Sequence, residues 1–255
     1  MSAAVPWYFL PQFRPARLQD CVLWLESGSF SGGIWRNLAP NYSDRNHGTA
    51  HGGVGLTPWH SQFSPAPTFY GDDEYVEVPN SDSLDIYGIN NPLSLEAWVK
   101  SYLSSDKLAV LIHKGTYPTY EYRFFIEYLK IDFVVNENGV FHRVQDPNPV
   151  DSNLHHWVGV YNTTHLLLYK DGSLVNSVSH SGVVEQNTYN LIIGHYGPGS
   201  YWFNGIIPLV RVYKGSLSHT EIRHNYTHHP LYYLQRGIDP YEVIAAATAA
   251  ATPSI

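Results

Sequence analysis

The chain has 255 residues, of which 44% are hydrophobic, 15% aromatic and 15% charged, and its formal net charge is −7. This length is sufficient for one large all-β domain, and so much apolar material excludes a disordered chain. The acidic residues are scattered and Lys and Arg form no run, so neither nucleic acid nor an anionic membrane surface is expected as a partner, because both attract a basic surface.

The single cysteine and the absence of a long apolar stretch exclude further classes of protein. Cys21 alone can form neither an intrachain disulfide nor a CxxC metal site, and its place in the apolar run 21–25 predicts a small buried side chain. No stretch approaches the roughly 18 apolar residues of a membrane span. Met1 is not followed by basic residues, and three prolines interrupt the first 15 positions, so no secretory signal is predicted.

The elements predicted along the chain are almost all strands. Residues 1–19 are rich in proline and aromatic side chains, which predicts an extended arm laid over a surface. From residue 20 to residue 226, short β-branched and aromatic runs alternate with clusters of Gly, Pro, Asn and Asp, which is typical of an all-β sandwich. The clearest strands are predicted at Tyr75–Val78, Leu93–Lys100, Ala109–His113, Tyr122–Glu127, Ile131–Val135, Trp157–Tyr161, Leu166–Lys170, Asn190–Ile193 and Val210–Tyr213.

Turn and capping signals complete this outline. Asp171-Gly172 between two apolar runs predicts a tight hairpin, because both residues tolerate positive φ. A capping box of Ser218 and Glu221 predicts one short C-terminal helix ending near Tyr226. Residues 227–255 form a C-terminal extension whose Ala/Thr tail is predicted to be disordered or donated to a neighbouring molecule. The predicted organisation is therefore an arm (1–19), a sandwich (20–226) and an extension (227–255).

An ordered series of short motifs through residues 20–226 resembles the laminin-G-like or pentraxin-like members of the concanavalin A-like lectin/glucanase superfamily, in their microbial form. No single motif is specific, but their common order agrees with the strand pattern. The resemblance implies a two-sheet antiparallel jelly roll with one concave and one convex sheet. The motifs are Trp35–Leu38, Asn46–Thr49, Tyr70–Pro79, Leu93–Lys100, His113–Gly115, His156–Tyr161, Leu168–Gly172, Leu191–Gly194, Phe203–Gly205 and Val210–Tyr213.

Calcium is the cofactor that the resemblance suggests, because many members of the family hold this ion. The resemblance implies a cluster of acidic and amide ligands in the loop after Gly194, as in pentraxins, but this loop contains no acid. In addition, Pro208-Leu209 replaces the acidic pair of the microbial form. Asp72 and Asp73, beside Glu74, remain as candidate calcium ligands. Backbone carbonyls would have to complete the six to eight oxygens that calcium prefers.

Glycoside hydrolysis is a further alternative, since this superfamily includes glucanases that use paired carboxylates. Strand alternation would place Asp73, Tyr75 and Glu77 on one face, and Glu121 and Glu127 on one face of another strand. The segment that contains Asp73 and Glu77 matches a non-catalytic motif of the binding family. No third acid accompanies Glu121 and Glu127. We therefore do not expect an enzyme.

Two histidines near the predicted helix are a candidate metal-ligand pair. His224 and His228 are spaced i, i+4 and would share a helical face, as zinc ligands do. No HExxH arrangement accompanies them, and the helix is predicted to end near Tyr226. Surface histidines at a helix end are the preferred interpretation.

Aromatic loops are the best candidates for a ligand-binding site. Sugar rings stack on Tyr and Trp, while polar neighbours bind the hydroxyl groups. The alternative is that these side chains only pack or form an assembly surface. The loops 116–120 and 196–202, with the preceding histidine, supply the candidate residues Tyr117, Tyr120, His195, Tyr196, Tyr201 and Trp202.

Two functional hypotheses follow from these observations. The first is a non-catalytic module that recognises a glycan or a glycosylated surface, located outside the cell, at a cell surface or at a virion surface. The second is a self-assembling structural subunit, such as a virion fibre or an extracellular filament, that contacts copies of itself through its arm and its tail.

Overall fold

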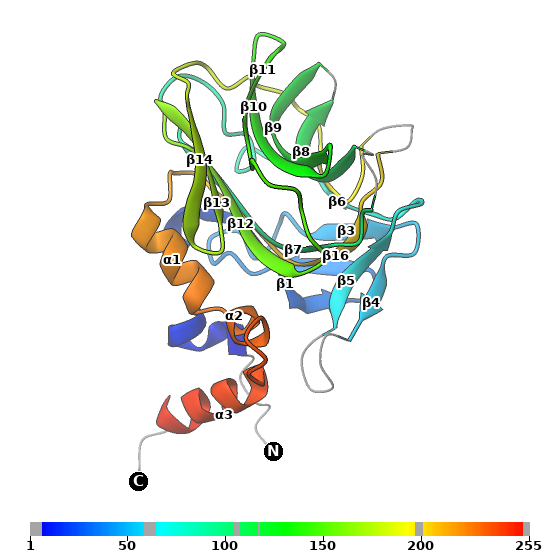
Figure 1. The fold of residues 1–255 in the computed structure, drawn as a ribbon, viewed down its shortest axis with the longest axis vertical. Coiled ribbons are helices and arrows are strands. Elements are labelled where there is room, and N and C mark those ends of the chain that lie inside the picture. Colours follow the sequence, from blue (N-terminus) through cyan, green and yellow to red (C-terminus); the bar gives the residue numbers. More distant parts are fainter. Residues whose placement is uncertain (1–6, 59–64, 105–107, 117, 197–200, 252–255) are drawn as a thin grey trace.

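The structure, a computed structural model, describes residues 7–58, 65–104, 108–116, 118–196 and 201–251. Sixteen strands dominate these residues, with short helices at both ends of the chain (Figure 1). Three short 3-10 helices precede the first strand, at Trp7–Phe9, Pro11–Phe13 and Leu18–Asp20. The strands are β1 (Cys21–Ser31), β2 (Ile34–Asn37), β3 (Gly48–His51), β4 (Gly55–Thr57), β5 (Ala66–Tyr70), β6 (Tyr75–Val78), β7 (Leu93–Ser101), β8 (Ala109–Thr116), β9 (Thr119–Glu127), β10 (Lys130–Glu137), β11 (Val140–Gln145), β12 (Leu154–Tyr161), β13 (His165–Lys170), β14 (Ser173–Ser179), β15 (Leu191–Ile193) and β16 (Asn204–Tyr213). The helices are α1 (His219–Thr227), α2 (Pro230–Leu234) and α3 (Pro240–Ala251).

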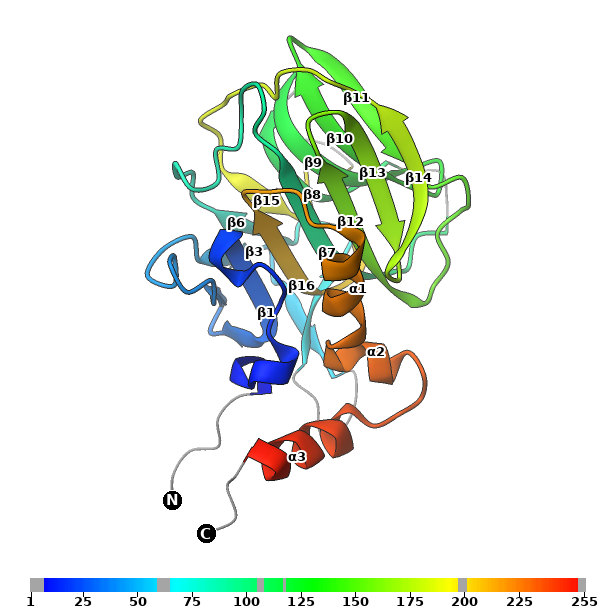
Figure 2. The same cartoon turned by 90° about the vertical axis from the view of Figure 1, so that its left-hand side faces the viewer.

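Fourteen of the strands form one hydrogen-bonded path that folds back on itself into two layers, and β5 pairs with β16 and with β4 beside this path (Figures 1 and 2). We call the run β11-β10-β9-β8-β15-β6-β3 the front sheet and the run β1-β16-β7-β12-β13-β14 the back sheet; β2 links them. Neighbouring strands along the path are antiparallel, as in the β6–β15 and β7–β12 pairs. The predicted two-sheet antiparallel jelly roll is therefore confirmed.

The local predictions agree with these elements. Each of the nine predicted strands overlaps an observed strand. Asp171 and Gly172 both have positive φ and join β13 to β14. Ser218 caps α1, where its hydroxyl accepts a hydrogen bond from the Glu221 backbone N–H and the Glu221 carboxylate accepts one from Ser218 N–H. The predicted capping box is thus the start of the predicted helix.

The main core lies between the two sheets. Alternation along β10 turns Phe133 and Val135 toward this core and leaves Asp132 and Val134 on the opposite face of the front sheet. The layers meet so closely that a Cβ atom on Gly159 of β12 would lie 2.3 Å from Phe133 Cγ. The front sheet consequently has one core face and one open face, directed away from the back sheet.

The outer face of the back sheet is covered by both ends of the chain. The side chains of Trp7 and Phe13 are buried in a second apolar cluster with Trp24, Trp98 and Leu231. The arm is therefore compact where the prediction was an extended segment: residues 7–20 form three 3-10 helices. The reason is that its aromatic side chains are buried together against the sheet, which one extended stretch would not allow for successive residues.

The C-terminal extension is more helical than predicted. Besides α1, the chain forms α2 and α3, and α3 lies apart from the sheets, next to α2 (Figure 2). The predicted disorder of the Ala/Thr tail is wrong for residues 244–251, which lie in α3, whereas its donation to a neighbouring molecule stays a prediction. Alanine has the highest helix propensity, and Pro240 suits the first turn of a helix, which explains this outcome. None of the helices in the described ranges combines the length and apolar character needed to cross a bilayer.

Candidate functional site

The open face of the front sheet carries a row of side chains from three adjacent strands. Ile192 of β15 pairs with Glu77 of β6 on one side and with His113 of β8 on the other. The neighbours of Glu77 along β6, Val76 and Val78, point into the core. Strand alternation therefore places the three side chains of the row together on the open face.

A cavity of about 340 Å³ opens above this row. Its walls combine aromatic rings with hydrogen-bonding groups, the composition that small-ligand sites share. Asn190 Nδ2 donates to Glu77 Oε1, and His51 Nε2 lies 3.5 Å from Glu77 Oε2, so this carboxylate is held in place. The lining residues are Tyr75, Glu77, His113, Gly115, Thr116, Tyr189, Asn190, Ile192, His195 and Tyr196.

Of the residues selected from the sequence, His195 and Tyr196 line this cavity, and three more contact their rings. His195 and Trp202 stack with ring centroids 3.4 Å apart. Tyr196 stacks on Tyr201 at 5.9 Å and meets Tyr120 at 5.4 Å. Five of the six predicted ligand-binding residues thus lie in neighbouring ring contacts, contributed by β9 and by the segments that flank the gap 197–200. The sixth, Tyr117, lies outside the described residues.

Two imidazole groups lie in the cavity wall. His195 Nδ1 is buried and has no hydrogen-bond partner among the described residues, whereas the buried ring of His113 lies against the backbone of Gly115 and His195. Burial lowers the pKa of His113 to about 3 and that of His195 to about 4. Both rings are therefore neutral near pH 7, and each neutral ring can donate one hydrogen bond and accept another.

Arg123, which the sequence analysis did not select, adds a cation to the open face. Its guanidinium lies over the rings of Tyr120, Phe125 and Phe141, at 4.5, 4.2 and 4.9 Å from their centroids. Burial lowers its pKa, but an arginine keeps its charge near neutral pH. The alternation of β9 could have placed Arg123 beside Phe125, but nothing in the sequence showed that Tyr120 and Phe141 would join them.

The acidic loop before β6 contains one buried carboxylate and two exposed ones. Glu74 is buried, and its Oε2 accepts the backbone N–H groups of Tyr70 and Asp72 at 3.0 and 3.2 Å. Asp72 and Asp73 are exposed. Among the described residues, neither belongs to a group of three His, Cys, Asp or Glu ligand atoms lying within 4.8 Å of one another. Calcium at Asp72 and Asp73 stays a prediction that would depend on backbone carbonyls.

One carboxylate pair considered for hydrolysis is not arranged as predicted. Glu121 and Glu127 were expected to share a face of β9, but Glu121 is buried 3.4 Å from Lys114 Nζ, while the partly exposed Glu127 pairs with Arg143. The cause is a β-bulge: Lys114 pairs with Tyr122 and Gly115 with Tyr120, so Glu121 is the extra residue that breaks the alternation.

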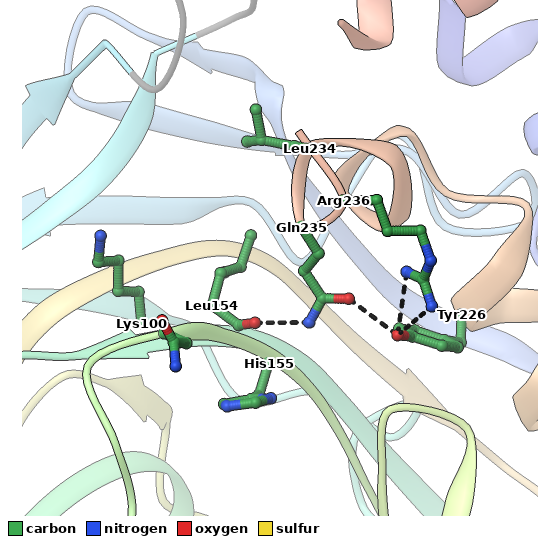
Figure 3. A pocket seen from close by; sticks show the side chains of 8 residues that line it. Lys100, Leu154, His155, Tyr226, Leu234, Gln235 and Arg236 are labelled. Atoms are coloured by element: carbon green, nitrogen blue, oxygen red, sulfur yellow. Dashed lines mark hydrogen bonds between the residues drawn. The ribbon is translucent and has the colours of Figure 1, made fainter. Parts of the chain in front are cut away.

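A larger cavity, of about 670 Å³, lies between the back sheet and the end of α2 (Figure 3). Its polar groups are largely paired with one another. Gln235 Nε2 donates to Leu154 O at 2.6 Å, and Tyr226 OH donates to Gln235 Oε1 at 2.8 Å. Arg236 also donates to Tyr226 OH (Figure 3). These bonds attach α2 to the sheet, so we consider the cavity on the open face the better ligand site.

Comparison with known proteins agrees with the fold. The family model of the concanavalin A-like lectin/glucanases superfamily matches residues 70–223. A search of the curated proteins gave no match. The family match covers more than half of the chain and includes the strands that form the open-face cavity.

Solved structures with the same fold include toxin binding domains. The binding domain of Paraclostridial Mosquitocidal Protein 1 superposes with a TM-score of 0.67 at 11% identity, covering 82% of this chain and 52% of that one. Botulinum neurotoxin type C, which depends on interaction with two ganglioside molecules to enter cells, gives 0.64 at 12% identity, covering 82% and 51%. The serotype D ligand binding domain in complex with N-acetylneuraminic acid gives 0.63 at 14%, covering 84% and 52%. The chain spans about half the length of these domains, and at such identities the likeness concerns the fold alone.

Proposed function

The chain belongs to the concanavalin A-like lectin/glucanase superfamily, and from that premise we propose that it is a non-catalytic module that recognises glycans. Its binding site is the open-face cavity, and its place of action is outside the cell, at a cell surface or at a virion surface. The module is the segment 20–226, with the arm 1–19 and the extension 227–255 as its supports.

The observation that carries this proposal is the meeting of two ring stacks with the unpartnered Nδ1 atom of His195 at one cavity. The His195–Trp202 stack and the Tyr196–Tyr201 stack offer flat apolar surfaces. The apolar face of a sugar ring can pack on such surfaces. His195 Nδ1, together with the polar side chains of Thr116 and Asn190 in the cavity wall, can bind hydroxyl groups. The site therefore offers both apolar and hydrogen-bonding contacts to a sugar.

Two further observations support a binding role over hydrolysis. Glu77 is the carboxylate among the residues lining the cavity, and Asn190 already donates a hydrogen bond to it. The toxin domains of similar fold include one in complex with N-acetylneuraminic acid and one whose toxin interacts with gangliosides, both of which are glycan ligands. We therefore propose sugars as the ligand class and no catalytic role.

A glycan array followed by titration tests the proposal. Replacing Tyr196 or Trp202 by alanine removes one surface of each ring stack, and we expect binding of the selected glycan to weaken by about tenfold or more. The matched control is Tyr102→Ala, because Tyr102 is an exposed tyrosine that belongs to neither ring stack and does not line the cavity. Binding to no glycan, or undiminished binding by both cavity variants, would contradict the proposal.

Calcium dependence is proposed separately for the loop of Asp72 and Asp73. If this loop holds a calcium ion, a chelator should weaken glycan binding or lower the unfolding temperature, and added calcium should restore it. The Asp72→Asn/Asp73→Asn double variant should then be insensitive to calcium. Equal calcium responses of the variant and the wild type would exclude these two ligands.

A second candidate function is a subunit of a self-assembling structure. One observation favours it: α3 lies apart from the sheets and exposes Ala245, Ala246 and Ala249 on one side (Figure 2). The arm favours it less, since Trp7 and Phe13 are buried within their own chain. Light scattering of the full chain and of a variant lacking 240–255 would decide. A full-length chain that is monomeric at high concentration would exclude this role.

A further inference from the structure

A group of metal-ligating side chains lies where two hairpins of the opposite sheets meet. Glu137 ends β10, His142 lies on the paired strand β11, and His180 directly follows β14. His142 pairs with Val135, which is two residues before Glu137, so both side chains project toward the core side at the rim of the sandwich. The β11 strand contacts both β13 and β14 of the back sheet, which brings His180 to the same place.

The three side chains converge closely enough to share one ion. One ligand atom of each lies within 4.8 Å of the others, which is the one such group among the described residues. His142 Nε2 is 3.6 Å from Glu137 Oε2, and the two imidazole rings lie 4.0 Å apart at an interplanar angle of 21°. Donors around a tetrahedral zinc ion are about 3.3 Å apart, so the group would complete the geometry after the two stacked rings turn toward a common ion.

The state of His180 points to a missing partner. This residue is only 7% exposed, and its Nε2 is buried without a hydrogen-bond partner among the described residues. A buried polar atom left unpaired costs free energy, and a bound ion would remove that cost.

The surrounding loop holds the group in place. Val183 N–H donates to Glu137 Oε1 at 3.1 Å, which leaves Oε2 facing His142. Tyr161 OH donates to Gly182 O at 2.6 Å and so holds the loop against the site. A Cβ atom on Gly182 would lie 2.2 Å from Glu137 Oε2, so a side chain here would displace the carboxylate. Such supporting hydrogen bonds orient metal ligands in proteins.

We propose that Glu137, His142 and His180 bind a divalent transition-metal ion of the zinc class. Two imidazoles and one carboxylate suit zinc, whereas calcium prefers oxygen ligands. The ion ties the β10–β11 hairpin of the front sheet to the end of the β13–β14 hairpin of the back sheet. It therefore acts as a clamp at an edge where the two layers are not joined by backbone hydrogen bonds. This site is distinct from the open-face cavity and independent of glycan binding.

The test is metal binding by the full-length chain after treatment with a chelator. Calorimetric titration with Zn²⁺ should give one site per chain, and the unfolding temperature should rise with Zn²⁺ but not with Ca²⁺. Co²⁺ should give the visible absorption bands of a tetrahedral site. His142→Ala and His180→Ala should each lose all three signals, and Glu137→Gln should weaken binding at least tenfold.

Two controls separate this site from other histidines. His165→Ala removes an imidazole on the neighbouring strand whose Nε2 lies 3.3 Å from Ser179 Oγ, and it should bind Zn²⁺ as the wild type does. His224→Ala/His228→Ala removes a pair of rings stacked at 4.1 Å, and it should keep the same site. Because His142 is partly exposed, His142→Ala is expected to fold even if His180→Ala does not.

Three outcomes would overturn the proposal. They are a wild type that binds no Zn²⁺ up to about 1 mM, a His142→Ala variant with unchanged affinity, and loss of binding only in the His224→Ala/His228→Ala variant.

Discussion

The guanidinium of Arg211 donates a hydrogen bond of 2.8 Å to the carboxylate of Glu96, and both side chains are buried. The other bonds of Glu96 complete a closed network: His156 Nε2 lies 2.9 Å from the same oxygen, and Tyr213 OH and Asn225 Nδ2 donate to the second oxygen at 2.9 Å each. Three strands of the back sheet and α1 are thereby joined at one carboxylate. Burial opposes the charge of Glu96, but Arg211 and then His156 outweigh it and lower the pKa to about 2.

Removing the charge of Glu96 should destabilise the fold strongly. In Glu96→Gln, Arg211 would remain charged and buried without its anion, which costs about 3–5 kcal/mol of unfolding free energy. The matched control is Glu127→Gln, since Glu127 forms a 2.8 Å pair with Arg143 but both side chains are partly exposed. This pair should be worth about 1 kcal/mol or less. Denaturant unfolding of both variants measures the difference, and equal losses would contradict the role given to the network.

The stability of the protein should fall between about pH 4.5 and pH 7 through Glu121. Burial raises the pKa of this carboxyl from 4.5 to about 7, despite the neighbouring Lys114. The folded state therefore holds a proton that the unfolded state has released in this range. The contribution of the protonated Glu121 carboxyl to the free energy of unfolding is complete below pH 4.5. It is lost as pH rises through 7, and the total loss is on the order of 3 kcal/mol.

Glu121→Gln isolates this effect, because glutamine cannot titrate. We expect the stability of the variant relative to the wild type to rise as pH increases from 4.5 to 7. Subtraction of the two curves removes the contribution of other groups, including Asp132, whose pKa burial raises to about 6. Chemical denaturation at several pH values provides the measurement. Parallel curves for the two proteins would show that Glu121 titrates normally in the folded state.

The behaviour of Glu121 also shows where prediction from sequence ends. The strands and the Asp171-Gly172 turn followed from local alternation and turn chemistry, which depend on neighbours in the chain. The bulge at Glu121 depends on pairing with β8, and no local pattern announces it. The same limit applied to the arm, whose fold depends on the distant partners Trp24 and Leu231.

For the candidate site, the sequence predicted that aromatic residues would take part, but it did not predict which residues would contact one another. Aromatic loops indicated Tyr120 and Tyr196, which lie 76 positions apart and meet at 5.4 Å only because β15 pairs with β8. His113 belongs to a strand, and its position on the open face depends on a bulge in β8. Glu137, His142 and His180 come from two sheets, so their spacing resembles no known metal motif.

The arm should stabilise the fold through its aromatic side chains. The Trp7 ring makes edge contacts with Phe13 and His229, at centroid distances of 6.0 and 5.1 Å, and is nearly buried. Trp7→Ala should therefore lower the free energy of unfolding by about 3 kcal/mol, as expected for a truncated core aromatic. Ile89→Ala is the control, since Ile89 is 69% exposed and should change stability by about 0.5 kcal/mol or less. A neutral Trp7→Ala would instead indicate that the arm detaches in solution and is available to other molecules.

Arg123 should make the open face prefer acidic sugars over neutral ones. Its guanidinium is held among Tyr120, Phe125 and Phe141 and is partly exposed on the face that carries the cavity. A hydrogen bond from a charged group contributes about 1.5–3 kcal/mol, so Arg123→Gln should weaken binding of a carboxylated glycan about tenfold or more. The neutral counterpart of that glycan should bind both proteins equally, and added salt should reduce only the wild type's preference. Arg123→Lys should restore little, because the planar guanidinium fits between the rings as an ammonium group does not. Equal losses for the acidic and the neutral glycan would assign Arg123 to packing of the aromatic rings and not to ligand charge.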